Sequence, residues 1–251
     1  MTSLANPFHN AGTSAATYVD VRPGYSRTLL EPLFDDVDGA PCVADIGAGT
    51  GKLTTMLPEI VGLKGSVWAI EPSPDMREQL TNRILDIVRI IDATGEHTTL
   101  PDNSCDVVFY AQSWHWVDPR AASAEAARIL KPGGKLVILF NQMDVSIPWV
   151  KRLTRIMRSG DVHRVTDTPV VVEKFSTPQL TVNVWQDHLT PRNVCKLGTT
   201  RSSWITSTPA NQERMQANLR WYLHEKLGYE EHHTVEIPYV TYMWVATLPK
   251  M

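Results

Sequence analysis

One segment constrains the fold of this chain more than any other. An apolar run ends in Asp45, and glycine then occupies every second position, at Gly47, Gly49 and Gly51. This pattern is typical of a buried strand that turns sharply beneath a small ligand and enters a helix. Glycine lacks Cβ, so the backbone can adopt positive φ and approach the ligand closely. The acidic residue before the turn would repel a pyrophosphate but attract an ammonium or sulfonium group.

Two common nucleotide-binding motifs do not match this segment. The dinucleotide fingerprint needs a third glycine where Lys52 stands. The P-loop needs a glycine in place of Ile46 and a serine or threonine in place of Leu53. The pattern Asp-x-Gly-x-Gly-x-Gly instead resembles the first motif of class I S-adenosylmethionine (SAM) dependent methyltransferases. A glycine turn in some other α/β domain is the alternative.

Length and composition predict one α/β domain, or one domain with a sizeable insertion. The chain has 251 residues, of which 43% are hydrophobic, enough for a full core. The net charge of −3 provides no general attraction to nucleic acid or anionic lipid, so we expect neither partner. We find no apolar run long enough for a membrane span and no visible signal peptide. Three scattered cysteines without a CxxC pair suit a reduced, cytoplasmic setting.

The middle of the chain alternates predicted strands and helices, which indicates a doubly wound parallel sheet. We predict strands over residues 42–46, 67–70, 88–91, 106–111 and 135–140. The helix after the glycine turn should be short or bent at Pro58, and further helices should start at Pro74 and Pro119. Beyond Asn141 we predict irregular helices and loops, a strand over 181–189, a short helix from Thr190-Pro191, and a helix over 211–227. Closing strands should cover 235–237 and 242–247.

Glu71 follows the second predicted strand and is a candidate nucleoside ligand. A carboxylate there can accept hydrogen bonds from both ribose hydroxyls of an adenosine. This fits NAD as well as SAM, and the alternative is a surface carboxylate before a turn.

The fourth predicted strand ends in a segment that should lie at the switch point of the sheet, where ligands bind. Gln112 could bind the amino-acid end of SAM. His115 could orient an acceptor or take its proton, since an unperturbed pKa of about 6.5 suits that role near neutral pH. The alternative is that Trp114 and Trp116 are core aromatics and His115 is their satisfied neighbour.

A series of segments, in order along about half the chain, resembles the trans-aconitate-methyltransferase-like branch of small-molecule methyltransferases. The matching segments are Tyr18 to Tyr25, Asp45 to Gly51, Ile70 to Ser73 with Met76-Arg77, Gly95-Glu96, Leu100-Pro101, Gln112 to Trp116, Arg128 to Gly134, and Asn141. The resemblance implies a mostly parallel, seven-stranded, Rossmann-like sheet with a helical or irregular substrate-cap insertion. It implies an N-terminal lid and first helix over 1–40, a SAM-binding core over 41–142, a cap with one strand over 143–230, and closing strands over 231–251.

The resemblance also implies site residues. Asp45, Gly47, Ala48 and Gly49 would hold the methionine part of SAM, and Glu71 would bind the ribose. The other implied residues are Pro72 and Met76 near the adenine; Thr94, Gly95 and Glu96 at its border; Gln112 and His115 at the transfer centre; and Tyr18, Arg22 and Tyr25 in the lid. No metal is implied.

The acceptor is a small molecule that we expect to be methylated on oxygen, a carboxylate or hydroxyl, by in-line displacement. Arg201, and with it Arg22, could grip an acceptor carboxylate, and Trp114 and Trp116 could contact the acceptor. The alternatives are methylation at carbon or nitrogen of an apolar or lipid metabolite, and a SAM-binding module without catalysis. The glycine spacing and Asp45 oppose a nicotinamide-dependent oxidoreductase. We expect a monomer or homodimer.

Overall fold

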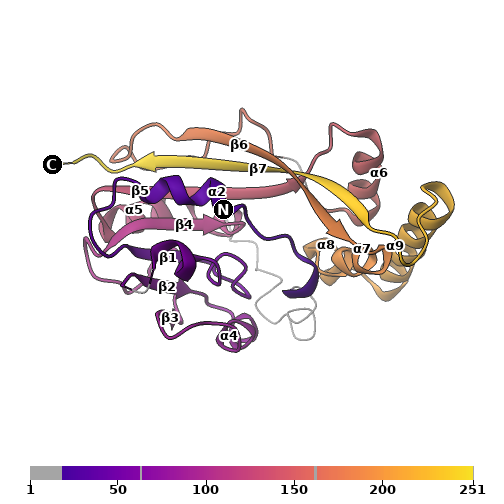
Figure 1. The fold of residues 1–251 in the computed structure, drawn as a ribbon, viewed down its shortest axis with the longest axis horizontal. Helices are drawn as coiled ribbons and strands as arrows, with labels where there is room; N and C mark the ends of the chain where they lie inside the picture. The colour runs from indigo at the N-terminus through magenta and orange to yellow at the C-terminus, as the bar shows by residue number, and fades with distance from the viewer. Residues whose placement is uncertain (1–18, 63, 161–162, 251) are drawn as a thin grey trace.

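The computed structural model describes residues 19–62, 64–160 and 163–250. These residues build one seven-stranded sheet, in the order β3-β2-β1-β4-β5-β7-β6 (Figure 1). Strands β1 to β5 are parallel, while β7 runs antiparallel to both β5 and β6. This is the doubly wound, mostly parallel sheet that the sequence predicts. The strands are β1 (Cys42–Ile46), β2 (Ser66–Ile70), β3 (Val88–Ile91), β4 (Cys105–Ala111), β5 (Leu130–Met143), β6 (Gln179–Leu189) and β7 (Val235–Thr247).

Most longer helices begin at a proline that follows a capping residue. Proline is favourable in the first turn because the N–H it lacks would have no partner there. The side chains of Ser73, Asp118 and Thr190 accept backbone N–H groups at the starts of α4, α5 and α7. None of the described helices is both long and apolar enough to cross a membrane. The helices are α2 (Arg27–Leu30), α3 (Leu57–Val61), α4 (Pro74–Thr81), α5 (Pro119–Ile129), α6 (Pro148–Met157), α7 (Pro191–Thr199), α8 (Ser202–Ile205) and α9 (Pro209–Trp221).

Alternate residues of the central strands bury opposite faces of the sheet. Ala44 and Ile46 pack with α5, whereas Val43 packs with α3 and α4. A strand that is covered on both faces reads as a nearly continuous apolar run, as β1, β4 and β5 do in the sequence. The burial of both faces fixes the strand ends rigidly, and these ends position the loops described below.

Three elements differ from the sequence predictions. Helix α3 is short, as predicted, but it begins only at Leu57 because the turn after β1 continues to Met56; Pro58 lies in its first turn, where a missing N–H is tolerated. The closing strands are one strand, β7, which passes through Pro238 without a break. Pro238 lies beyond Met143, the last β5 residue paired with β7, and therefore needs no donor on that side. The helix predicted over 211–227 starts at Pro209 and ends in a π-helical turn over Tyr222–Lys226.

The segment between β5 and β7 forms its own apolar cluster. Helices α6, α7, α8 and α9 gather at one end of the molecule, where β6 ends and β7 begins (Figure 1). Val150, Leu153 and Met157 of α6 are buried together with Leu219 of α9. The strand of this segment, β6, is not separate from the core but forms the edge of its sheet.

Candidate functional site

A cavity of about 610 Å³ opens at the carboxyl ends of the parallel strands. Its size lies within the range of small-molecule sites. It lies next to β1 and β4, where the strand order reverses, as expected for doubly wound sheets. Most of the residues predicted from the sequence line it: Arg22, Tyr25, Asp45, Gly47, Ala48, Gly49, Glu71, Pro72, Met76, Thr94, Gly95, Glu96, Gln112, His115, Trp116 and Arg201. Tyr18 lies outside the described residues.

The turn after β1 has the left-handed backbone that glycine favours. Gly47 and Gly49 have φ values of 70° and 58°. A Cβ on Gly47 would lie only 2.5 Å from the Ser113 Cβ, whereas a Cβ on Gly49 would meet no atom within 4 Å. Gly47 therefore lets the turn pack on the loop after β4, and Gly49 leaves open space toward the cavity that a ligand can fill.

Asp45 lies at the cavity wall and is almost completely buried, with 1% of its surface exposed. Its Oδ2 accepts a hydrogen bond of 2.6 Å from the Thr54 hydroxyl, but its Oδ1 has no partner among the described residues. Burial, with a smaller contribution from the negative charge of Glu71, raises the pKa of Asp45 to about 7. A buried carboxylate oxygen without a partner is costly, so this site is suited to a cationic ligand group.

Glu71 connects the end of β2 with the glycine turn. Its Oε2 accepts the Gly49 N–H at 2.8 Å, and its Oε1 accepts the Ser73 N–H, also at 2.8 Å. An ionised carboxylate only accepts hydrogen bonds, so Glu71 contributes an acceptor group to the cavity wall. The sequence predicted Glu71 as a nucleoside ligand but did not indicate that it also holds the turn.

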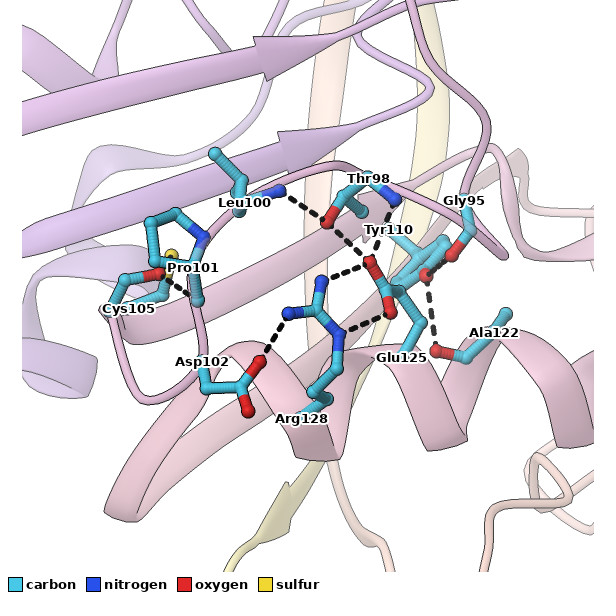
Figure 2. A network of polar contacts seen from close by, with 11 residues as sticks. Gly95, Thr98, Leu100, Pro101, Asp102, Cys105, Tyr110, Ala122, Glu125 and Arg128 are labelled. Atoms are coloured by element: carbon cyan, nitrogen blue, oxygen red, sulfur yellow. Dashed lines mark hydrogen bonds and ion pairs between the residues drawn. The ribbon is translucent and has the colours of Figure 1, made fainter.

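The loop after β3 borders the cavity through Thr94, Gly95 and Glu96 and is held from beneath by α5. Figure 2 shows the Tyr110 hydroxyl between two backbone carbonyls; it donates to Gly95 at 2.8 Å and to Ala122 at 3.3 Å. The loop position is therefore fixed by a buried side chain of β4.

A second part of the same network lies further along this loop (Figure 2). The Glu125 Oε1 accepts the N–H and the hydroxyl of Thr98 at 2.7 and 2.6 Å, and Arg128 donates to both Glu125 oxygens. Arg128 also pairs with Asp102 at 2.5 Å. Burial opposes ionisation of Glu125, but the hydrogen bonds from Arg128 and Thr98 prevail and lower its pKa to about 2.

The segment after β4 contains a strained backbone. Gln112 has a φ of 58°, which is uncommon for a residue with a side chain, and its Nε2 donates to the Asn141 carbonyl at 2.5 Å. Such strain persists only where neighbouring contacts enforce it, and it concentrates at functional sites. Here it joins the ends of β4 and β5 at the cavity wall.

His115 lies in the cavity wall, but its titration differs from the sequence prediction. The ring opens into the cavity, yet the surrounding walls and the positive charges of His163 and Arg22 disfavour its protonation and lower its pKa to about 4. The imidazole is therefore neutral near neutral pH, and its low pKa makes it a weak base. The sequence argument used the unperturbed pKa of about 6.5, which applies to an imidazole in water and not to His115 in this cavity.

Trp114 also lies elsewhere than predicted. It is not among the residues that line the cavity; its ring is buried against Tyr110, with centroids 4.8 Å apart in an edge-to-face arrangement. Trp116 does line the cavity and lies against His115, with centroids 4.7 Å apart. The two tryptophans thus separate into a core residue and a cavity residue.

The described part of the predicted lid is tied to both sides of the cavity. Arg22 donates to the Thr200 hydroxyl at 2.9 Å and to the Thr200 carbonyl at 2.6 Å, at the end of α7. The Gly24 carbonyl accepts a hydrogen bond of 2.8 Å from the Asn141 amide, at the end of β5. These contacts direct two of the Arg22 donors toward α7 rather than into the cavity.

Several cavity residues were missed at the sequence level. Gln142 and His163 form a pair of 2.9 Å hydrogen bonds, in which each residue donates once and accepts once. Gln142 follows Asn141 at the end of a buried strand, the same signal that pointed to Asp45 and Gln112. His163 stands in a segment without periodicity and gave no such signal. Other lining residues that the sequence did not indicate include Lys52, Ser159, Gly160, Ser202 and Tyr239.

Several cationic side chains line the cavity. Arg22, Lys52 and Arg201 line it together with His163. Arg201 is buried, and burial with the charge of Arg83 lowers the pKa of Lys52 from 10.5. The cavity thus combines a buried carboxylate at the glycine turn with positive charges on other parts of its wall, as needed to bind two ligands of different charge.

The comparisons with known proteins agree with this arrangement. Residues 44–138 match a family model described as a methyltransferase domain. An uncharacterised methyltransferase of Mycobacterium tuberculosis (strain ATCC 25618 / H37Rv) is 37% identical over 238 residues, which cover 94% of this chain and 95% of the relative. A ubiquinone/menaquinone biosynthesis C-methyltransferase of Shewanella piezotolerans is 40% identical over 103 residues, 39% of this chain and 41% of the relative.

Among solved structures, a protein of Anaeromyxobacter dehalogenans proposed to be a type II methyltransferase has the same fold. The TM-score is 0.67 at 19% sequence identity, over 92% of this chain and 99% of that one. The fold and the site define the class of SAM-dependent methyltransferases. Given its match to the Mycobacterium tuberculosis relative, the chain belongs to the methyltransferase family. It is an enzyme, and S-adenosylmethionine is its cofactor.

The cavity residues fit that cofactor. The partnerless Oδ1 of Asp45 can accept hydrogen bonds from an ammonium group, and the open space at Gly49 admits a ligand close to the backbone. The buried hydroxyl of Thr50, also without a partner among the described residues, is a further free group in the same wall.

Proposed function

We propose that this enzyme methylates a carboxylate oxygen of a small-molecule acceptor. The observation that carries the proposal is the pairing of two cationic wall residues, Lys52 and Arg201, with a His115 that is neutral near neutral pH. Arginine binds carboxylates through two parallel hydrogen bonds, and positive charge at the wall favours an anionic acceptor.

A carboxylate suits this site better than a hydroxyl. An alcohol must lose its proton during transfer, and a base with a pKa of about 4 accepts that proton poorly. A carboxylate is already ionised at neutral pH and needs no base. His115 then orients the acceptor, as a neutral hydrogen-bonding ring, and does not act as a general base.

We assign the remaining roles to residues that line the cavity. Bound SAM supplies an activated methyl group on its sulfonium. Asp45 and the turn from Gly47 to Gly49 hold its amino-acid end, Glu71 binds the ribose, and Gln112 fixes the wall at the transfer centre. Pro72, Met76, Thr94, Gly95 and Glu96 surround the adenine, and Arg22 and Tyr25 close over the cofactor. The protein contributes alignment and the exclusion of water, not a covalent step.

Carbon or nitrogen methylation of an apolar metabolite is the competing function. The similarity to a quinone-biosynthesis C-methyltransferase covers only 39% of this chain. The acceptor-side residues His163 and Arg201 belong to the segment 143–230, which we assign to the acceptor cap. A non-catalytic SAM-binding role is disfavoured by the cationic wall, which SAM itself does not require.

The proposal also covers the family branch, the cellular location and the oligomeric state. We assign the chain to the trans-aconitate-methyltransferase-like branch, acting in the cytoplasm as a monomer or homodimer on a small molecule, without a nucleic-acid partner. The three free cysteines, Cys42, Cys105 and Cys195, are compatible with a reducing compartment.

The test is transfer from SAM with a labelled methyl group to metabolite pools sorted by functional group. Carboxyl methyl esters release methanol on mild alkaline treatment, whereas ethers, methylamines and methylated carbons do not. We expect alkali-labile, volatile label with an organic-acid pool. Label that appears only in alkali-stable products would contradict carboxylate methylation, and the absence of transfer to every pool would favour the non-catalytic role.

A further inference from the structure

A second, smaller cavity lies between α6 and α9 and is lined by four arginines. Its volume is about 270 Å³, and its charged wall consists of Arg152, Arg155, Arg158 and Arg214. Arg152 and Arg155 are three residues apart, which places them on one face of α6, and Arg158 follows the last residue of that helix. We infer that this groove is a binding site for a phosphoryl group that carries at least two negative charges. The inference is independent of the proposed function.

The arginines are not neutralised within the chain. Among the residues that the structure describes, none of the four forms an ion pair or a side-chain hydrogen bond. Like charges at helical spacing repel one another and destabilise a helix. In a chain of net charge −3, this concentration of exposed positive charge marks a place where an external anion would be attracted.

Arg158 adds an independent observation. It ends α6 in the left-handed conformation, with φ 49° and ψ 48°, where glycine is the usual residue. This backbone holds the Arg158 side chain at the wall of the groove. Attraction to the helix dipole explains a cation near the end of α6, but it does not explain Arg214 in the middle of α9.

The remaining residues of the groove wall indicate the chemical class of the ligand. Asn211 and Asn218 add amide donors beside the guanidinium groups, while the Ser207 hydroxyl in the same wall donates to the Ser203 carbonyl. Arginine matches the geometry of phosphate oxygens with paired N–H donors, better than lysine does. The small volume favours a phosphoryl group of a small molecule or of a lipid headgroup over a long polyanion.

The two cavities share no lining residue, but residues that are adjacent in the sequence line one or the other. Arg158 lines the groove, while the next two residues, Ser159 and Gly160, line the larger cavity. The test must therefore separate binding in the groove from binding in the cofactor cavity.

The first experiment is calorimetry of the full chain with inorganic pyrophosphate at fixed ionic strength, with SAM at saturation to occupy the larger cavity. We expect saturable binding that is at least tenfold tighter than sulfate binding. Arg214→Gln and Arg158→Gly should each weaken it at least tenfold. The second variant places the preferred residue at a left-handed position, so its loss of binding cannot be attributed to misfolding.

Arg120→Gln is the matched control. Arg120 is exposed on α5, does not line the groove, and carries the same charge. Its variant should bind pyrophosphate within twofold of the unmodified protein. Equal losses in the control and the groove variants, binding no tighter than sulfate, or binding that SAM abolishes would overturn the inference.

Vesicles distinguish the two sources of the phosphoryl group. A lipid headgroup would be identified if the protein cosediments with phosphatidic acid vesicles but not with phosphatidylcholine vesicles, and if Arg214→Gln loses this cosedimentation. Pyrophosphate binding without cosedimentation would identify a soluble ligand. Both results support the site. The inference is contradicted if the protein does not bind pyrophosphate and if Arg214→Gln cosediments with vesicles as well as the unmodified protein does.

Discussion

The Glu71 carboxylate and the backbone N–H of Gly49 lie 2.8 Å apart, so a side chain at the end of β2 holds the turn that follows β1. Its other oxygen accepts the N–H of Ser73 at the start of α4. One buried acidic residue thus fixes two loops of the cofactor cavity relative to each other. The geometry of the glycine turn depends on a residue that is 22 positions away in the chain.

Replacing Glu71 should therefore affect both stability and cofactor affinity. Glu71→Ala leaves two buried N–H groups without acceptors, and we expect the free energy of unfolding to fall by about 1–3 kcal/mol. SAM affinity should fall at least tenfold. Urea denaturation and calorimetry measure the two effects, and Glu78→Ala, an exposed residue of α4, is the control. A Glu71→Ala protein with normal stability and affinity would show that the turn does not need this contact.

Asp45 should make SAM binding pH-dependent. Its pKa in the folded protein is about 7, so it is half protonated there and becomes an anion at higher pH. SAM affinity should rise between pH 6 and 7.5 as Asp45 ionises, then fall above roughly pH 8 as the α-amino group of the ligand loses its proton. Asp45→Asn should remove the rise and weaken binding at pH 7.5 about tenfold or more. Calorimetry across this range, with buffers of matched ionisation heat, measures the profile; a rise that persists in Asp45→Asn would assign it to another group.

Asp45 also affects stability without ligand. Its folded-state pKa of about 7 exceeds the ordinary value of 3.8, so it favours folding only while it is protonated. The favourable contribution is complete below pH 3.8 and disappears as the pH rises through 7. The free energy of unfolding of Asp45→Asn, relative to that of the unmodified apoprotein, should therefore be higher at pH 8 than at pH 5.

His115 should not titrate in the physiological range. Because its pKa is about 4, turnover with a carboxylate acceptor should show no inflection from His115 between pH 6 and 8. His115→Gln keeps a hydrogen-bonding group, so we expect turnover to fall less than tenfold and the pH–rate profile to keep its shape. His115→Ala should cost more. An inflection near pH 6.5 that His115→Gln removes would restore the role of general base.

The Glu125 network should govern acid stability. Its pKa of about 2 lies below the ordinary value of 4.5, so it stabilises the fold above pH 4.5, and this contribution is lost as the pH falls through 2. We expect Glu125→Gln to lower the free energy of unfolding at pH 7 by about 1–3 kcal/mol, since Thr98 and Arg128 lose charged partners. The variant should lose less stability than the unmodified protein between pH 4.5 and 2. Guanidine denaturation at several pH values compares the two proteins; parallel curves would exclude this role for Glu125.

The central sheet could be predicted closely because its signals are local. β1 and β3 have the bounds read from the sequence, and α4 and α5 start at Pro74 and Pro119 as predicted. The start of α3 and the continuity of β7 could not be read in the same way. Both depend on tertiary pairing: a proline is tolerated where a neighbouring strand ends or where a helix begins.

The candidate site also contains residues with a local sequence signal and residues without one. Asp45, Glu71 and Gln112 stand at strand ends, and a strand end is visible in the sequence. His163 reaches the cavity through its two hydrogen bonds with Gln142 and through stacking on Phe140, with ring centroids 3.9 Å apart. No local pattern reports such contacts between distant residues. The pKa of His115 depends on its surroundings, which composition and spacing do not describe.

The position of β6 at the sheet edge has a consequence for the history of such enzymes. Because the helices from α6 to α9 are inserted in the chain between β5 and β7, they can diverge while β1 to β4 keep their packing. Substrate preference can then evolve separately from the machinery that is common to the family. Exchange of this outer module between homologues offers a practical route to new methylation products.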